Sequence, residues 1–363
     1  MPAYLNAISG AVPRHAYPQQ RILEVMREWH GADRRAGRLL GGIYRASEID
    51  FRHSVVDDFQ PGASGGFFYD PERGEFLSPT TGERNELYRR EATPLAAQAA
   101  RRVLDDARAA AAGITHLITV SCTGFFAPGP DIELIHELGL NPGVERYHIG
   151  FMGCYAAIPA LRLARSLVEA RPESRVLIVS VELCTLHLQA QHDPDSLVAA
   201  SVFSDGAAAA LVTGRREGPR SYRLDRFATA LVPGASREMA WTIGDSGFLM
   251  TLSSKIPAVI EEHLEGAVGQ LLEGEDPGGF SAWAVHPGGR AILDSVEKSL
   301  PLPAGGLAAS RDVLRQFGNM SSATVLFVLE RILRTRDYPP GPVGMLAFGP
   351  GLTVEGAVLS LEE

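Results

Sequence analysis

The sequence predicts an α/β fold built from two similar halves. Short runs that read as strands alternate with amphipathic helical patterns, as they do when helices connect the strands of one sheet. The strand runs are nearly continuously apolar, which is typical of strands that are covered on both faces. The alternation stops at the polar segment 214-GRREGPRSYR-223 and then resumes in the same style.

The first half contains four predicted strands and two predicted helices. The strands are 115-THLITVS-121, 145-ERYHIGF-151, 175-RVLIVSVEL-183 and 207-AAAALVT-213. Apolar residues at helical spacing predict helices over 93–110 and 155–170. Residues 57–84, which precede these elements, are rich in glycine, proline and charge. We expect a long surface loop there, and loops of that length are candidates for function.

The second half repeats this pattern with fewer elements. Strands are predicted at 281-SAWAV-285 and 343-VGMLAF-348, and helices over about 290–300 and 321–334. The break falls near residues 214–222. We therefore predict two units, 1–218 and 219–363.

Composition excludes several classes of protein. The chain has 363 residues, of which 45% are hydrophobic and 21% charged, enough for two hydrophobic cores. Its apolar runs are too short to span a bilayer, and its start does not resemble a secretion signal. The net charge of -9 argues against nucleic acid or anionic membranes as partners. Three cysteines without a CxxC pair predict no disulfide, no structural zinc and a cytoplasmic location.

Cys154, in 150-GFMGCYAAIPALRLARSLVEA-170, is a candidate nucleophile. A cysteine at a helix start faces free N–H groups and the positive end of the helix dipole, and both favour the thiolate. The alternative is a small buried hydrophobic residue. Pro159 lies five residues further on, where a proline is tolerated only within the first turn of a helix.

Two further residues fit a site around such a cysteine. His286 ends an apolar run and enters 286-HPGGRAIL-293, a strand-to-turn-to-helix transition of the kind where α/β proteins place their sites. An imidazole there would form an ion pair with a thiolate, although a core histidine is equally consistent. Asn319, in 316-QFGNMSSATVLFVL-329, precedes an apolar helix. It is either a helix N-cap or a side-chain donor to the site.

These three motifs in this order resemble the type III polyketide synthases, the chalcone and stilbene synthase-like enzymes of the thiolase superfamily, in their bacterial form. The resemblance includes 115-THLITVSCTGFFAPGPDIEL-134, 201-SVFSDGAAAALV-212 and the ending 347-AFGPG-351, in which Ala347 replaces a glycine. The related β-ketoacyl carrier-protein synthase III enzymes usually carry an HQAN-type motif where this chain has HPGG. The resemblance implies a thiolase fold, with both halves packed in αβαβα layers.

The resemblance also implies a role for each motif. Cys154 would carry the acyl chain as a thioester, and His286 and Asn319 would stabilise the enolate formed when malonyl-CoA loses carbon dioxide. Phe203 would be an aromatic gate between the CoA tunnel and the site, unless it is only core packing. Acyl-CoA and malonyl-CoA would be the substrates, and neither a metal nor a redox cofactor would be needed.

Other positions align with the cavity lining of the family. Trp241 stands where the plant enzymes usually have glycine, and Met250 replaces a common phenylalanine, so we expect an altered cavity. Cys122 and Cys184 are either small fillers or additional nucleophiles. The complete set of expected lining residues is Phe203, Cys122, Cys184, His187, Trp241, Met250 and Ser321.

The expected partners follow from the same resemblance. The family is homodimeric, and Ala127 here replaces a methionine that reaches the partner's cavity in the family. The lysines and arginines that hold the CoA phosphates in the plant enzymes align with Leu39, Gly42 and Ala46. Nearby arginines could substitute, could form a solvated helix face, or could bind an acidic acyl carrier protein. They are Arg34, Arg35, Arg38, Arg45 and Arg52.

The expected activity is therefore an acyltransferase reaction. Malonyl-CoA would be condensed repeatedly onto a fatty acyl starter, and the chain would close to an alkylpyrone or alkylresorcinol. One alternative is a single condensation on a carrier protein, as in synthase III enzymes. Another is a protein without catalytic activity that binds acyl chains.

Overall fold

The computed structural model describes residues 1–29, 34–60, 66–70, 72–189 and 193–363. The helices are α1 (Gln19–Trp29), α2 (Arg34–Ala46), α3 (Thr81–Asp106), α4 (Pro130–Leu138), α5 (Ala157–Ala170), α6 (Pro194–Val202), α7 (Ile256–Leu272), α8 (Arg290–Ser299), α9 (Ala308–Phe317) and α10 (Thr324–Arg334). The strands are β1 (Tyr4–Ala11), β2 (His15–Pro18), β3 (Phe51–Ser54), β4 (Tyr69–Asp70), β5 (Glu75–Phe76), β6 (His116–Ser121), β7 (Glu145–Gly150), β8 (Arg175–Leu183), β9 (Asp205–Thr213), β10 (Ser221–Leu231), β11 (Met239–Gly244), β12 (Gly247–Leu252), β13 (Ala282–Val285), β14 (Gly341–Gly349) and β15 (Thr353–Glu362).

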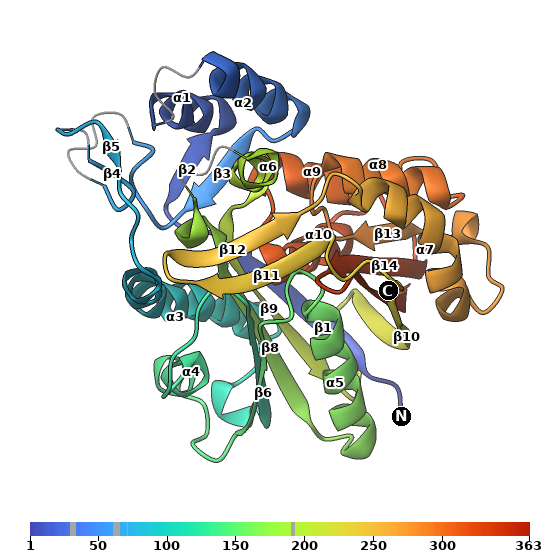
Figure 1. The fold of residues 1–363 in the computed structure, drawn as a ribbon. Coiled ribbons are helices and arrows are strands. Elements are labelled where there is room, and N and C mark those ends of the chain that lie inside the picture. The colour runs from blue at the N-terminus through green and yellow to red at the C-terminus, as the bar shows by residue number, and fades with distance from the viewer. Residues whose placement is uncertain (30–33, 61–65, 71, 190–192) are drawn as a thin grey trace.

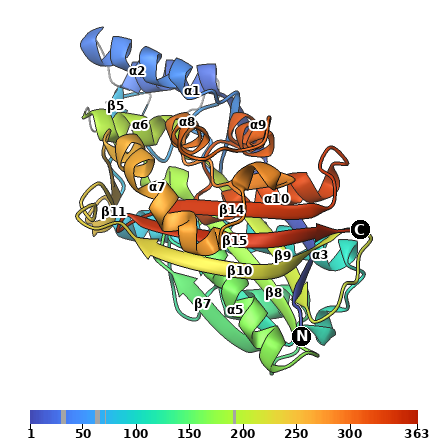
Figure 2. The ribbon, with the colours of Figure 1, turned by 90° about the vertical axis from the view of Figure 1, so that its right-hand side faces the viewer.

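Nine strands form one hydrogen-bonded sheet in the order β13-β14-β15-β10-β1-β9-β8-β6-β7. Strand β1 pairs with β9 along its whole length, whereas only Tyr4 and Leu5 pair with β10. The sheet therefore has two parts that meet at this short contact, one in each half of the chain. Figure 2 shows β10, β15 and β14 of the second part side by side.

Three hydrophobic clusters define the layers. Helices α5 and α10 share one cluster with both parts of the sheet, so they form the middle layer. Helix α3 packs against the outer face of the first part, and α7 and α8 cover the second part, at the opposite side of the molecule (Figure 1). Helix, sheet, helix, sheet and helix follow one another, which is the layered αβαβα arrangement that the sequence predicts.

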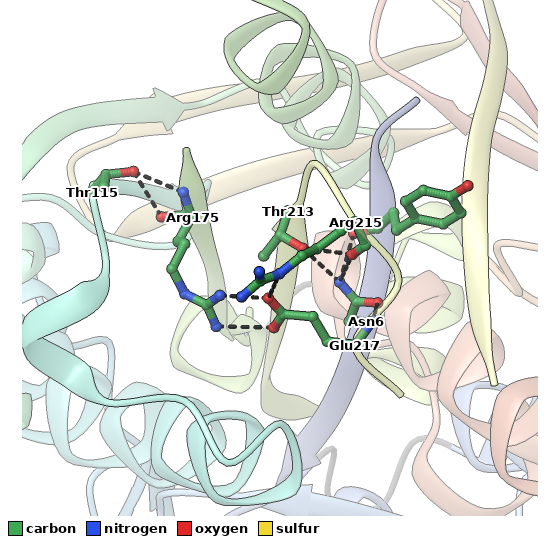
Figure 3. A network of polar contacts seen from close by, with 7 residues as sticks. Asn6, Thr115, Arg175, Thr213, Arg215 and Glu217 are labelled. Atoms are coloured by element: carbon green, nitrogen blue, oxygen red, sulfur yellow. Dashed lines mark hydrogen bonds and ion pairs between the residues drawn. The ribbon is translucent and has the colours of Figure 1, made fainter. Parts of the chain in front are cut away.

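The polar segment between the halves is anchored to the first half (Figure 3). Both Arg175 guanidinium Nη atoms donate to the Glu217 carboxylate, at 2.6 and 3.0 Å. The Asn6 side chain accepts from the Glu217 backbone N–H at 2.9 Å and donates to the carbonyl of Arg215 at 3.1 Å. The segment is therefore a fixed connection between two packed halves.

Several predicted elements differ in extent from the observed ones. The helix predicted over 93–110 begins at Thr81, where Thr80 and Glu83 form a capping box, and it ends at Asp106. The helix predicted over 321–334 begins with a 3₁₀ turn, and α10 follows from Thr324. The predicted loop 57–84 contains the β4–β5 hairpin and the first residues of α3, while its residues 61–65 and 71 lie outside the described part.

The prediction for the strand at 145–151 is wrong about its burial. The strand forms β7, at the edge of the sheet, and most of its residues are exposed rather than covered on both faces. The run 145-ERYHIGF-151 begins with two charged residues, which a strand covered on both faces rarely carries, and β7 pairs with β6 alone among the described strands.

Candidate active site

Cys154 lies in a turn just before α5, because the backbone of the preceding residues is sharply bent. Phe151 and Gly153 have positive φ angles of 57° and 89°. A side chain at Gly153 would meet the ring of Pro350 at 2.7 Å, so the ending 347-AFGPG-351 packs directly against this elbow. Helix α5 begins at Ala157, two residues later than predicted, so Pro159 is its third residue and fits the first turn.

Cys154 faces a cavity of about 400 Å³ that brings together residues far apart in the sequence. His286 and Asn319 line the same cavity, together with Phe203 and Met250. Cys154 precedes the middle-layer helix α5, His286 follows β13, and Asn319 precedes the middle-layer helix α10. The cavity thus lies where the two halves of the chain meet.

Burial dominates the protonation of the thiol. It raises the pKa of Cys154 to about 11, while hydrogen bonds from the Ser321 and Asn319 side chains act in the opposite direction. In the resting chain the thiol is therefore neutral at pH 7. A proton acceptor is needed to make the thiolate.

His286 has the properties of such an acceptor. Its side chain is 1% exposed, and neither ring nitrogen has a hydrogen-bond partner among the described residues. Burial lowers its pKa to about 3, so the ring by itself is neutral at pH 7, and it accepts the thiol proton only if the resulting charged pair offsets the burial of both groups. A buried polar group without a partner is rare in folded proteins and calls for a ligand or a reaction partner. His286 and Cys154 form neither a hydrogen bond nor an ion pair in the described part of the chain, so the predicted ion pair stays a prediction.

Asn319 is held by contacts on both sides. Its side-chain nitrogen donates to the carbonyl of Gly288 at 3.1 Å, and its side-chain oxygen accepts from the N–H of Ser321 at 2.9 Å. The side chain bonds within the turn that leads to the helix, and the structure gives it no N-cap bond to α10. A hydrogen bond from the Asn319 side chain also lowers the pKa of the Cys154 thiol, so this side chain lies beside the thiol.

A second, inner cavity of about 50 Å³ lies next to the first one. Phe203 and Met250 line both cavities, which fits a gate at Phe203. The predicted lining residues Cys184, His187 and Trp241 line the inner cavity. On its far side it reaches Ile22 and Met26 of α1, which sequence reasoning did not identify.

Cys122 and Ser321 line neither of these two cavities. The Cys122 sulfur lies 3.3 Å from the Ser321 hydroxyl, which in turn hydrogen bonds to Cys154. Burial raises the pKa of both Cys122 and Cys184 well above the usual range, so neither is a thiolate. The placement of Cys122 away from both cavities supports packing, whereas Cys184 lines the inner cavity and its predicted alternatives stay open.

Sequence reasoning also missed Glu182, at the end of β8. This fully buried carboxylate accepts from the Cys122 N–H at 2.9 Å, from the Thr123 hydroxyl at 2.8 Å and from the Ser322 hydroxyl. Burial raises its pKa, and these hydrogen bonds act against that shift. A glutamate inside the apolar run 175-RVLIVSVEL-183 was the available signal.

The arginines proposed for the CoA phosphates separate into three groups. Arg38 and Arg45 are exposed on α2, as a phosphate contact requires, and the side chains of Arg34 and Arg35 lie outside the described residues. Arg52 is wrong as a phosphate ligand, because it is 5% exposed and its guanidinium is occupied by protein acceptors. Arg290, at the mouth of the outer cavity, was missed.

Fold and site geometry point to an acyl-transferring enzyme, and comparison with known families agrees. "Chalcone and stilbene synthases, N-terminal domain" matches residues 2–215, and "Chalcone and stilbene synthases, C-terminal domain" matches residues 223–361. The chain belongs to this family, the type III polyketide synthases. No helix in the described ranges is long and apolar enough to cross a membrane.

Individual relatives agree with this assignment. The chain is 33% identical to "Alpha-pyrone synthesis polyketide synthase-like Pks18" of Mycobacterium tuberculosis, over 88% of this chain and 81% of that one. It is 32% identical to 1,3,6,8-tetrahydroxynaphthalene synthase of Streptomyces peucetius subsp. caesius, over 97% and 92%. The crystal structure of PKS-I from the brown alga Ectocarpus siliculosus matches with a TM-score of 0.92, 30% identity and coverage of 99% and 98%. The chain spans 11% of the length of another relative, probable polyketide synthase 1 of Dictyostelium discoideum.

Proposed function

We propose that the chain condenses malonyl-CoA repeatedly onto an acyl starter bound to Cys154 and then cyclises the product. One observation carries this proposal: a single cavity holds a buried thiol, a histidine with two free nitrogens and an asparagine donor. The family membership of the chain supplies the class of reaction.

The steps follow from the chemistry of these residues. His286 takes the thiol proton, and the Cys154 sulfur attacks the acyl-CoA carbonyl, so that an acyl thioester forms and CoA leaves as its thiol. Malonyl-CoA then loses carbon dioxide, and its electron pair becomes an enolate whose oxygen accepts from His286 and Asn319. The enolate carbon attacks the thioester, which forms a carbon–carbon bond and releases the Cys154 thiolate.

Phe203 would favour the decarboxylation. An apolar ring beside a carboxylate disfavours the charged group, and that group is lost as neutral carbon dioxide. Arg38, Arg45 and Arg290 are candidates for the CoA phosphates at the entrance. We expected a carrier-protein partner because of a patch of arginines, but Arg52 is buried and cannot belong to that patch. CoA thioesters are therefore the proposed acyl donors.

We further propose a fatty acyl starter and an alkylpyrone or alkylresorcinol product. The Mycobacterium relative, named for alpha-pyrone synthesis, supports a pyrone. The inner cavity of about 50 Å³ is much smaller than the outer one of about 400 Å³, so a long chain requires its lining to move. Met26 and Met250 line it, and methionine side chains are flexible enough to do so.

The proposed enzyme is a homodimer in the cytoplasm. The exposed edge strand β7 supports a dimer, since unpaired strand edges in folded proteins are usually covered. Phe125, Tyr147 and Phe151 are also exposed on or near this strand, at 47%, 36% and 37%. The three cysteines of the chain are free, in agreement with a reducing compartment.

Mass spectrometry of products from malonyl-CoA and a panel of acyl-CoAs tests the proposal. We expect cyclised products containing two or more malonyl units, and a Cys154→Ala variant that forms none and carries no acyl group. Products with a single added unit would favour the synthase III-like alternative. Acyl binding without turnover would favour the binding protein, and turnover limited to short starters would overturn the fatty acyl assignment.

A further inference from the structure

Arg52, on β3, is a buried cation whose hydrogen bonds go to neutral groups. Its Nε donates to the side-chain oxygen of Gln19 at 2.8 Å, and its Nη1 donates to the carbonyls of Ala200 and Phe203 at 2.7 and 2.9 Å. No carboxylate forms an ion pair with it among the described residues, although Asp205 acts on it at longer range. Burying a charge is expensive, so such an arginine needs contacts of this kind.

The accepting carbonyls lie at the end of α6. That helix ends at Val202, and Phe203 is its C-cap. Carbonyls at a helix C-terminus lack hydrogen-bond partners within the helix and carry partial negative charge. A guanidinium group supplies both N–H donors and a positive charge there. The planar fork of arginine lets one side chain reach Gln19 and two carbonyls at once.

The same short segment is paired with Asn319 on its other side. The N–H of Asn319 donates to the carbonyl of Val202 at 2.8 Å, and the N–H of Ser204 donates to the carbonyl of Asn319 at 2.9 Å. The Ser204 hydroxyl also bonds to the backbone N–H and carbonyl of His53, the residue after Arg52, at 2.7 and 3.0 Å. Residues 202–204 are thus held between β3 and the Asn319 turn.

We propose that Arg52 is a positioning residue that fixes Phe203 between the two cavities and, through this pairing, keeps Asn319 in register with the Cys154 thioester. The proposal rests on the proposed function. If the Arg52 guanidinium no longer donates to Gln19, Ala200 and Phe203, the carbonyl of Phe203 loses its hydrogen bond and the Phe203 ring can move. Enolates would then form at a distance from the thioester and pick up a proton before they condense.

The measurable consequence is uncoupling, that is, more carbon dioxide released per malonyl unit incorporated into product. An Arg52→Lys variant keeps the charge but replaces the planar fork with a point charge. A displacement of about 1 Å at a reacting centre can lower a rate about 10²-fold. We expect the kcat for product formation to fall by about that factor, with the KM for malonyl-CoA changed less and the uncoupling ratio raised several-fold.

Arg220 offers a matched control far from the site. It is 9% exposed and donates to the carbonyls of Leu333, in the last turn of α10, and of Tyr338, at 3.0 and 2.7 Å, and it also pairs with the exposed carboxylate of Glu363 at 3.0 Å. An Arg220→Lys variant should lose stability in the same way. Because the uncoupling ratio does not depend on the folded fraction, it should stay at the wild-type value.

A second variant covers the case in which Arg52→Lys does not fold. Gln19→Leu removes the acceptor that orients the Arg52 Nε and should raise the uncoupling ratio in the same direction, by a smaller factor. Equal ratios for Arg52→Lys and Arg220→Lys would overturn the proposal. A raised KM for acyl-CoA with unchanged kcat and coupling would instead restore Arg52 as a phosphate ligand. Absence of decarboxylation and product in the wild type would reject the proposed function itself.

Discussion

Two buried histidines, His187 and His286, line the two cavities that share Phe203, and their surroundings differ. Burial lowers the pKa of both to about 3. His187 uses both ring nitrogens: Nε2 donates to the carbonyl of Thr123 at 2.7 Å, and Nδ1 accepts from the N–H of Phe248 at 3.0 Å. Within the described ranges of the chain, neither ring nitrogen of His286 has a hydrogen-bond partner. A shifted pKa therefore does not identify the reactive histidine, whereas unused hydrogen-bonding capacity does.

The largest expected effect separates these two residues directly. His286→Ala should lower condensation by about 10³-fold or more, since it removes a proton acceptor and an enolate donor. It breaks no side-chain hydrogen bond of the resting protein. His187→Ala leaves the Thr123 carbonyl and the Phe248 N–H unpaired, at a cost of about 1–3 kcal/mol each.

Product formation per folded molecule and the denaturation midpoint together check this pair. His187→Ala should lower the midpoint more than His286→Ala does and should retain catalysis. The reverse pattern, with His187→Ala inactive but fully stable, would contradict the distinction between a bonded and an unbonded histidine.

Asn319 lies between these two cases, because its side chain has structural bonds and also a hydrogen bond toward the Cys154 thiol. In a Cys154→Ala background, which cannot form a thioester, malonyl-CoA decarboxylation should persist on His286 and Asn319. Adding Asn319→Ala should lower it by about 10²–10³-fold, the usual effect of losing one such donor. Carbon dioxide release from labelled malonyl-CoA measures this.

Asn319→Asp is the informative control. It keeps an oxygen that accepts from the Ser321 N–H but has no N–H to donate. We expect it to be as inactive as Asn319→Ala. An active Asn319→Asp enzyme would mean that this residue only shapes the turn before α10.

The pH dependence of Cys154 alkylation tests whether His286 takes the thiol proton. In His286→Ala, the thiol keeps a pKa raised by burial to about 11, so the alkylation rate should rise about tenfold per pH unit from 7 to 9. In the wild type, an imidazolium–thiolate pair between His286 and Cys154 would offset the burial of both groups, so the rate should vary much less over this range. The rate constant for iodoacetamide, with labelling mapped to Cys154, gives both profiles. Coincident profiles would rule out proton transfer to His286.

The smallest expected effect concerns Trp241, a half-buried neighbour of His187. Its indole N–H donates to the carbonyl of Cys122 at 2.7 Å, and its ring stands edge-on to His187 at 5.4 Å. Trp241→Gly should change product length or the pyrone-to-resorcinol ratio while malonyl-CoA is still consumed. Since the ring is not fully buried, the loss of stability should fall short of the roughly 3–5 kcal/mol of a core tryptophan.

Ile243, exposed on the same strand, is the control for this change. Its exposed fraction is 52%, so Ile243→Gly alters the hairpin backbone without altering the cavity. If both variants give the same product mixture as the wild type, Trp241 has no role in the cavity. If Trp241→Gly loses activity together with its folded state, it is a packing residue.

The sequence was sufficient where local chemistry determines the answer. Periodicity predicted six strands and four helices that the structure contains. Most of their ends are shifted by a few residues, and α3 begins at Thr81 rather than at residue 93, because capping and tertiary contacts set the boundaries. It also singled out Cys154, His286 and Asn319 through glycine-rich turns at the ends of elements. It did not reveal that Glu182 is buried and accepts hydrogen bonds from several residues, or that Arg52 is buried and donates to the carbonyls of Ala200 and Phe203.

What only the tertiary structure decided is which polar groups are already occupied. Arg38, Arg45 and Arg52 have the same chemistry in the sequence, yet two are exposed on α2 and one is enclosed by carbonyls. Hydrogen-bond acceptors come from segments about 150 residues away, as Phe203 does for Arg52, and no local pattern encodes that distance. The sequence by itself determined the family, the layers and the reactive residue types, whereas long-range packing determined which of them are free to react.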